Sequence, residues 1–139
     1  MGKCVRSIAF VVVVCVVLAA CQKQGGNEVA EQGKAWDYTV VAVRDCPEDF
    51  LAEIEAKKMN PFQMSYMDGE YLYIAQGYGE QPTGGYSIAV NGFYEQGEAL
   101  CLDTELKGPG KDESVKQKAS YPYIIIKTEK TEREVNFKK

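Results

Sequence analysis

The first question for this sequence is which side chains could carry out bond-making chemistry. None of its 139 residues is histidine, so Ser-His-Asp and Cys-His systems, which use an imidazole as the base, cannot be assembled. Beyond residue 21 the only thiols are Cys46 and Cys101, too few for a metal cluster without histidine. The sequence therefore predicts no nucleophilic catalysis, no metal and no other cofactor.

The same two thiols leave a structural question open. Outside the cytoplasm Cys46 and Cys101 could form a disulfide, closing a loop of about 55 residues and stabilising the fold by about 4 kcal/mol in the chain-entropy model. They could equally remain free, because a sequence does not give the Cα separation on which pairing depends.

Carboxylates are the remaining candidates for catalysis, because two of them can together hydrolyse a glycoside. Each acidic pair has a structural explanation instead: the first turn of a helix for Glu48 and Asp49, and the polar face of a strand for Asp103 and Glu105. A domain of this size gives no sign of the deep pocket that such an enzyme needs. We therefore predict that the protein is not an enzyme.

A glycine-rich stretch from Gly79 to Tyr86 is the best candidate for binding. Its first glycines have the spacing of a phosphate-binding P-loop, but Gly85 and Tyr86 stand where Lys and Ser or Thr are required. The stretch could be a tight turn, or a surface of exposed backbone and tyrosine rings for a partner. The candidate partner-binding residues are Tyr78, Pro82, Thr83, Gly84, Gly85 and Tyr86.

Tyrosines on or beside the expected strands could extend such a surface, because tyrosine offers rigid contact area for peptides and sugars. Strand tyrosines also serve ordinary sheet packing, and the two roles are not distinguished by sequence. The seven tyrosines are Tyr71, Tyr73, Tyr78, Tyr86, Tyr94, Tyr121 and Tyr123.

The N-terminus predicts export and a lipid anchor. Lys3 and Arg6 precede a run of 13 apolar or small residues, Ile8 to Ala20, which is too short to span a bilayer. The sequence Leu18-Ala19-Ala20-Cys21 resembles the lipobox of bacterial lipoproteins, in which the cysteine is lipidated before cleavage. We expect residues 1–20 to be a signal peptide and Cys21 to anchor the chain at the extracytoplasmic face of the cell membrane; the alternative is an ordinary secretory signal.

Composition and charge limit the partners. Residues 21–35 are rich in glycine, amides and charges, which predicts a flexible tether before a single domain over 36–139. Removing Lys3 and Arg6 from the 16 basic residues leaves 14 against 20 acidic residues, a net charge of −6. Nucleic-acid binding needs clustered basic residues, so no nucleic-acid partner is expected.

The elements that must position these residues are mostly strands. Residues 47–58 have apolar side chains at helical spacing, and Tyr38 to Val43 predicts a strand buried on both faces. Phe62–Tyr66 and Tyr71–Ala75 flank Asp68-Gly69, which is typical of a type I′ hairpin turn.

Further strands are expected at 86–91, 99–106 and 121–127. The last of them is expected to be central because its isoleucines are apolar on both faces, and the tail from Glu129 either adds an edge strand or frays. The predicted class is α+β: a mostly antiparallel sheet or half-open barrel of five or six strands with one amphipathic helix.

Several of these stretches together resemble one known family. Tyr71–Gly79, the segment Pro82-Thr83-Gly84-Gly85-Tyr86, Gly108-Pro109 and Tyr121–Ile126 are similar to the C-terminal domain of the PrcB family. The resemblance implies an accessory lipoprotein without catalytic residues that stabilises or helps to assemble an exported protease complex.

The sequence as a whole predicts a membrane-anchored, non-catalytic protein-interaction module. Its expected partners are the membrane, through the lipid on Cys21, and an exported protein, with a protease as one candidate. The alternative is a lipoprotein of the cell envelope that binds peptides or glycans through the same tyrosines.

Overall fold

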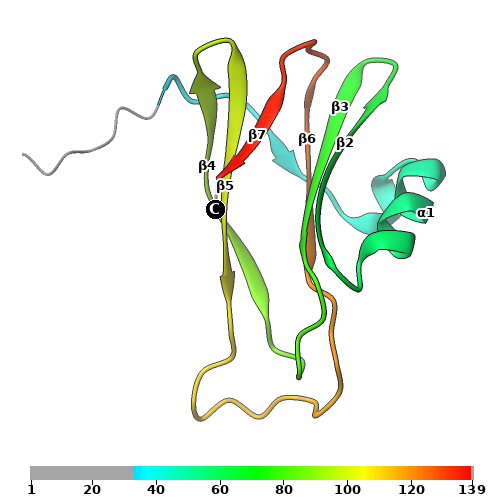
Figure 1. Cartoon of the computed structure of the whole chain (residues 1–139), viewed down its shortest axis with the longest axis vertical. Helices are drawn as coiled ribbons and strands as arrows, with labels where there is room; N and C mark the ends of the chain where they lie inside the picture. The colour runs from blue at the N-terminus through cyan, green and yellow to red at the C-terminus, as the bar shows by residue number, and fades with distance from the viewer. Residues whose placement is uncertain (1–32, 139) are drawn as a thin grey trace, which may run out of the picture. The chain divides into compact units, whose positions relative to one another are not determined.

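The computed structural model describes residues 33–138, which form two open β-sheets and one α-helix (Figure 1). A four-stranded sheet has the order β1-β6-β3-β2, and a three-stranded sheet has the order β4-β5-β7. All neighbours are antiparallel except β5 and β7. The elements are β1 (Thr39–Val40), the 3₁₀ turn η1 (Val43–Asp45), α1 (Glu48–Lys57), β2 (Pro61–Asp68), β3 (Tyr71–Tyr78), β4 (Ser87–Gln96), β5 (Ala99–Lys107), β6 (Tyr123–Glu129) and β7 (Val135–Lys138).

This architecture agrees broadly with the predicted α+β class, but it corrects the details. The described residues contain seven strands where five or six were expected, and they form two separate sheets where one sheet or a half-open barrel was expected. The chain changes sheet after β3, after β5 and after β6. Sequence patterns indicate where strands form without indicating which strands pair.

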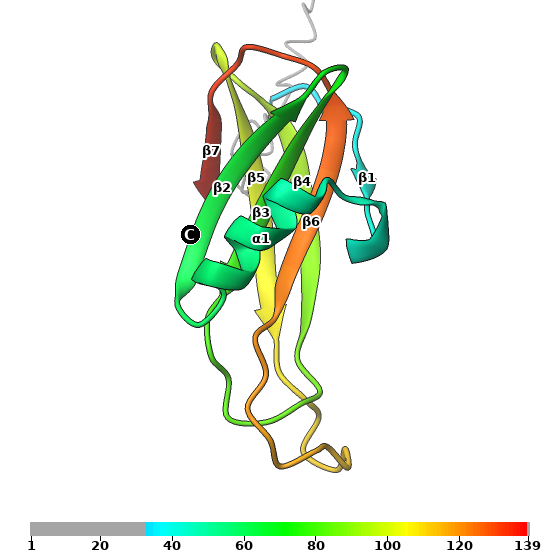
Figure 2. The same ribbon diagram turned by 90° about the vertical axis from the view of Figure 1, so that its right-hand side faces the viewer.

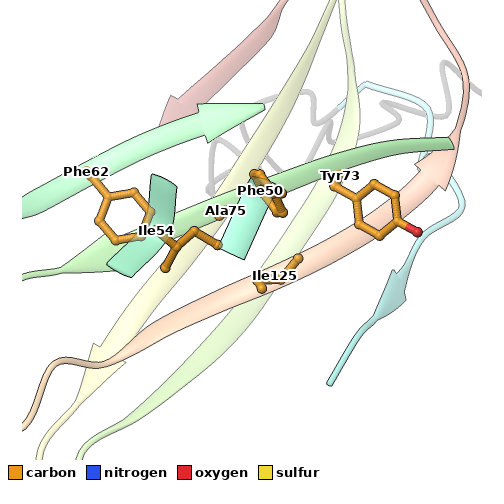
Figure 3. Packing of buried hydrophobic residues seen from close by; sticks show 6 residues of the cluster. All are labelled: Phe50, Ile54, Phe62, Tyr73, Ala75 and Ile125. Atoms are coloured by element: carbon orange, nitrogen blue, oxygen red, sulfur yellow. The ribbon is translucent and has the colours of Figure 1, made fainter. Parts of the chain in front are cut away.

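The helix α1 forms where the sequence predicts it and covers one face of the four-stranded sheet (Figure 2). Glu48 and Asp49 lie in its first turn and Lys57 lies in its last turn. The charge of each interacts favourably with the helix dipole at that end. Phe50 and Ile54, four residues apart, are fully buried against the sheet. Figure 3 shows these side chains with the others of this cluster, Phe62, Tyr73, Ala75 and Ile125.

A second cluster fills the space between the sheets. Along β3, Leu72 and Ile74 point into this cluster, while Tyr73 and Ala75 point to the helix. The central strands are therefore buried on both faces, as the continuous apolar runs of β3 and β6 indicate. The cluster consists of Leu72, Ile74, Phe93, Leu100, Leu102 and Ile126.

The hairpin β2–β3 is confirmed, but its turn is shifted by one residue. Asp68 pairs with Tyr71, so the two loop residues are Gly69 and Glu70. Only Gly69 has a positive φ, +50°, which is the type II′ pattern with glycine first and not the type I′ pattern predicted. The hairpin β4–β5 has the same pattern of turn, with Gly97 at a φ of +64° as the first loop residue between the paired residues Gln96 and Ala99.

The strand predicted at Tyr38–Val43 is wrong in extent and in burial. Only Thr39 and Val40 pair with β6, and the 3₁₀ turn begins at Val43. Val40 is 55% exposed and Val43 is 49% exposed, because β1 lies at the edge of its sheet beyond the cover of α1 and of the second sheet. The β-branched side chains favoured a strand but could not show which strand would be covered.

The other two expectations for strands near the C-terminus are confirmed. The isoleucine strand is central, since β6 lies between β1 and β3. The tail adds an edge strand: β7 pairs in parallel with Leu100–Asp103 of β5.

Docking of α1 gives a direct test of this packing. We expect Phe50→Ala to lower the free energy of unfolding by about 3–5 kcal/mol, because it removes the ring at the centre of the helix-side cluster. Urea denaturation followed by circular dichroism measures the change. The control Glu53→Ala, on the exposed side of the same helix, should cost less than about 0.5 kcal/mol, and equal losses from both variants would contradict the packing described.

Candidate partner-binding surface

Two long connections meet at one end of the sheets. The segment 79–86 joins β3 to β4, and the segment 108–122 joins β5 to β6. Both lie at the end of the molecule opposite the hairpin turns β2–β3 and β4–β5 (Figure 1). We call these two segments together the loop end.

Backbone hydrogen bonds hold the segment 79–86 on two sides. Gln81 and Ser120 form an isolated antiparallel bridge with N···O distances of 2.8 and 3.0 Å, and Gly84 N donates to the carbonyl of Lys116 at 2.9 Å. On the other side Glu80 N donates to the carbonyl of Met59 at 3.2 Å, just after α1. The segment is thus an ordered connection supported by its neighbours, which lowers the entropic cost of binding a partner.

Gly85 fits this place for two reasons. Its φ of +83° is in the left-handed region that glycine adopts without strain. A Cβ at this position would lie 2.5 Å from Cγ1 of Val115 and 3.0 Å from Cβ of Pro109, so the second segment packs against the bare glycine backbone. Gly85 therefore serves both the turn and the contact between the two segments.

Five of the six candidate residues lie together in the segment 79–86, and the sixth does not. Pro82 and Gly85 are exposed, whereas Thr83, Gly84 and Tyr86 are partly buried. Tyr78 instead places its hydroxyl 2.7 Å from Oγ1 of Thr104 on the opposite sheet. The accessible part of the predicted site is thus a small surface around Pro82 and Gly85.

The tyrosines do not gather into one patch. Tyr73 and Tyr94 are buried, while Tyr71 is 39% exposed with Nζ of Lys127 4.4 Å from its ring centre. Tyr121 lies at the loop end, where its hydroxyl donates to Glu80 at 3.0 Å and Lys58 Nζ is 5.7 Å from its ring centre. Most of the tyrosines therefore serve packing, and those at the loop end stabilise the connections.

A groove of about 570 Å³ opens beside the loop end, between the edges of the two sheets. Leu106 of β5 and Pro61 of β2 contribute apolar surface, and Gln76, Tyr78 and Thr104 contribute polar groups. The side-chain oxygen Oε1 of Gln76 is buried and has no hydrogen-bond partner in the described part of the chain. Sequence reasoning missed Gln76, although an amide inside the apolar run of β3 is the signal that could have found it.

The structure has Cys46 and Cys101 as free thiols, one of the two alternatives that the sequence left open. Cys46 packs beside the helix-side cluster, and burial raises the pKa of its thiol. Cys101 alternates with Leu100 and Leu102, which face the space between the sheets, so its side chain is on the outer face of β5. The two thiols therefore lie on opposite sides of the pair of sheets, an arrangement that does not allow the short Cα separation of a disulfide.

Several acidic side chains in the described residues form ion pairs with lysines. Asp103 pairs with Lys138 at 3.0 Å, and Glu53 pairs with Lys57 at 3.8 Å. Among residues 33–138 no three His, Cys, Asp or Glu side chains come together as metal ligands.

The predicted signal peptide, Cys21 and most of the predicted tether lie outside the described residues. Within the described part, Lys34 and Ala35 already pair with β4, through Glu95 and Tyr94. No helix among the described residues has the length and apolar character of a membrane span.

Comparison with protein families finds that residues 72–129 match the family described as PrcB C-terminal. The match runs from β3 through the loop end to β6 and covers less than half of the 139 residues. It confirms the resemblance drawn from the sequence. Searches of curated proteins and of solved structures found no match.

The hydrogen bond that holds the loop end at Tyr121 predicts a pH dependence. Its hydroxyl donates to the Glu80 carboxylate, which raises the pKa of Tyr121 because ionisation would set two negative charges together. The bond therefore stabilises the fold fully below pH 10, the ordinary tyrosine value, and this contribution is lost as the pH rises through the raised pKa.

We expect Glu80→Gln to lower the pKa of Tyr121 towards its ordinary value, measured by NMR from the tyrosine Cζ shift of the full chain. Asp68→Asn, a matched loss of charge at the hairpin end, serves as the control and should leave Tyr121 unchanged. An unaltered Tyr121 titration in Glu80→Gln would show that the bond does not form.

Proposed function

We propose that this protein, whose residues 72–129 match the PrcB C-terminal family, is a non-catalytic interaction module anchored to the outside of a cell membrane by lipid on Cys21. Its task is to stabilise or assemble an exported protein complex, with a protease as the leading candidate partner. The family match supports the accessory role. The absence of histidine and the separate pairing of Asp103 and Glu53 support a function without catalysis.

The observation that carries this proposal is the loop end, an ordered surface inside the family match. It presents Pro82 and Gly85, while hydrogen bonds from Glu80, Gln81 and Gly84 fix the backbone around them. An ordered surface loses less conformational entropy on binding than a flexible one. The loop end therefore suits repeated contact with one protein surface.

The place where the described chain begins also supports an anchored module. Lys34 accepts a hydrogen bond from Glu95 N, next to the β4–β5 turn at Gly97 and Glu98. This turn lies at the opposite end of the sheets from the loop end (Figure 1). The described part therefore begins at the hairpin end of the sheets, away from the loop end, as expected for a module anchored through its N-terminal side.

The groove between the sheets favours a second candidate function. A lipoprotein that binds peptides or glycans needs a concave site with a few polar groups, and the groove offers Gln76 and Thr104. Under this alternative the loop end would support the groove and take no part in recognition.

The anchor is tested by Cys21→Ser in the producing cell. We expect the native protein to carry acyl chains on Cys21, without residues 1–20, and to sediment with membranes, because two acyl chains anchor stably. The variant should retain an unmodified residue at position 21 and leave the membrane fraction. Mass spectrometry of the native protein that found a free thiol at position 21 would remove the anchor from the proposal.

The interaction surface is tested by co-purification after cross-linking at the cell surface. Pro82→Arg puts a charge into the exposed part of the loop end, and we expect it to reduce recovery of the partner at least tenfold, as at an interface centre. Gln96→Arg makes the same change of charge at the exposed hairpin end and should leave recovery unaltered. If the native chain recovers no partner, or if both variants recover equal amounts, the loop end is not the interface.

A further inference from the structure

One edge of β5 is paired along only half of its length. β7 runs beside Leu100–Asp103 and ends at Lys138, and no described strand pairs with that edge from Thr104 to Lys107. The backbone of Leu100 faces this edge, since its N–H donates to the carbonyl of Glu134 at 2.8 Å. Because backbone direction alternates along a strand, the N–H and C=O groups of Thr104 and Leu106 face the same edge.

The groove lies directly against this free edge. β5 lines one side and the start of β2 the other, while β3 and the end of β7 complete the lining. The lining residues include Thr104, Glu105 and Leu106 of β5, Pro61, Phe62 and Gln63 of β2, and Lys138 of β7. β2 is itself the outer strand of its sheet, so the groove separates two sheet edges. An extended chain is the shape that fits between two such edges.

Gln76 supplies an independent sign that a ligand belongs in the groove. It is 6% exposed, lies on the same face of β3 as Ile74, and lines the groove. Its Oε1 atom is the one buried side-chain oxygen or nitrogen without a partner in the described part of the chain, whereas the hydroxyls of Tyr78 and Thr104 satisfy each other. A buried acceptor without a donor destabilises the free protein, so a function in binding would explain its presence.

We propose that the groove binds an extended segment of a partner polypeptide, which adds as a strand to the edge of β5 at Thr104 and Leu106 and donates a hydrogen bond to Gln76. The proposal deepens the interaction function above and depends on it. A polypeptide suits the site because it repeats N–H and C=O groups at the spacing of the free edge. β7 already pairs with the neighbouring part of the same edge, Leu100–Asp103.

The side chains of the bound segment follow from the alternation along a strand. Alternate residues point into the groove, where Pro61 and Leu106 offer apolar surface and Gln76 takes one donor. The residues between them face solvent. We therefore expect an extended sequence that alternates apolar or small residues with polar ones, and includes one donor such as serine, threonine or asparagine among those pointing inward.

The experiment uses the full chain and a phage library of random 12-residue peptides. The best peptide is synthesised, and its affinity is measured by fluorescence anisotropy. We expect Gln76→Leu to weaken binding about tenfold, the value of one hydrogen bond, while its Tm rises because the lone buried acceptor is gone. A peptide that binds Gln76→Leu as tightly as the native chain overturns the proposal, as does a library from which no peptide is enriched.

The strand pairing needs a separate pair of variants. Leu106→Pro removes the N–H that faces the free edge while leaving the hydrogen bonds to β4, and a proline is tolerated at such an edge. It should weaken binding at least tenfold, one or more hydrogen bonds being lost, whereas Leu106→Ala keeps the N–H and should bind at least several times more tightly than Leu106→Pro. Amide exchange by NMR should slow at Thr104 and Leu106 on binding, and unchanged exchange there overturns the pairing.

The outcome is separable from that of the proposed function. If Pro82→Arg loses the cellular partner while Gln76→Leu and Leu106→Pro retain it, the groove proposal fails and the interaction function stands. If no partner is recovered but peptides bind in a Gln76-dependent way, the peptide site stands and the accessory role fails. Gln76-dependent binding of a peptidoglycan oligosaccharide, with no peptide selected, overturns the peptide site.

Discussion

The structure depends on two central strands, β3 and β6, that are covered on both faces. β3 and β6 send alternate side chains to α1 and to the second sheet, so Ile125 belongs to the helix-side cluster and its neighbour Ile126 to the cluster between the sheets. Burial of apolar surface on both sides gives these strands most of the stabilisation that a small domain can obtain. A shift of one residue in either strand would exchange the two sets, so the register is fixed strongly.

The same arrangement explains why the open places lie where they do. The apolar contacts between the sheets run from Leu72 to Ile74 on β3 and from Leu100 to Leu102 on β5, and beyond them the facing residues become Gln76, Tyr78 and Thr104. β7 covers only the apolar half of β5. The polar half is left with a groove and a free strand edge, next to the two connections of the loop end. The apolar residues that stabilise the fold and the candidate binding surfaces thus lie on opposite halves of the same strands.

Local patterns predicted the elements that are stabilised locally or buried on both faces. The helix at Glu48–Lys57 follows from two apolar side chains four residues apart and from charges that suit its ends, and the isoleucine run predicted a central strand. The hairpin at Gly69 followed from turn residues. The exposed strand β1 and the type of turn at Gly69 and Glu70 were predicted wrongly, because burial and backbone angles depend on what packs nearby.

The sequence by itself determined the lack of histidine, the acidic charge, the family resemblance and the glycines that a loop needs, since these reside in residue types and short spacings. Only the tertiary structure decided that the strands divide into two sheets, that Cys46 and Cys101 lie apart as free thiols, and that Gln76 faces a groove. Each of these depends on contacts between residues far apart in the chain, such as that of Tyr78 with Thr104. Such contacts follow from how sheets stack, and no local pattern encodes this.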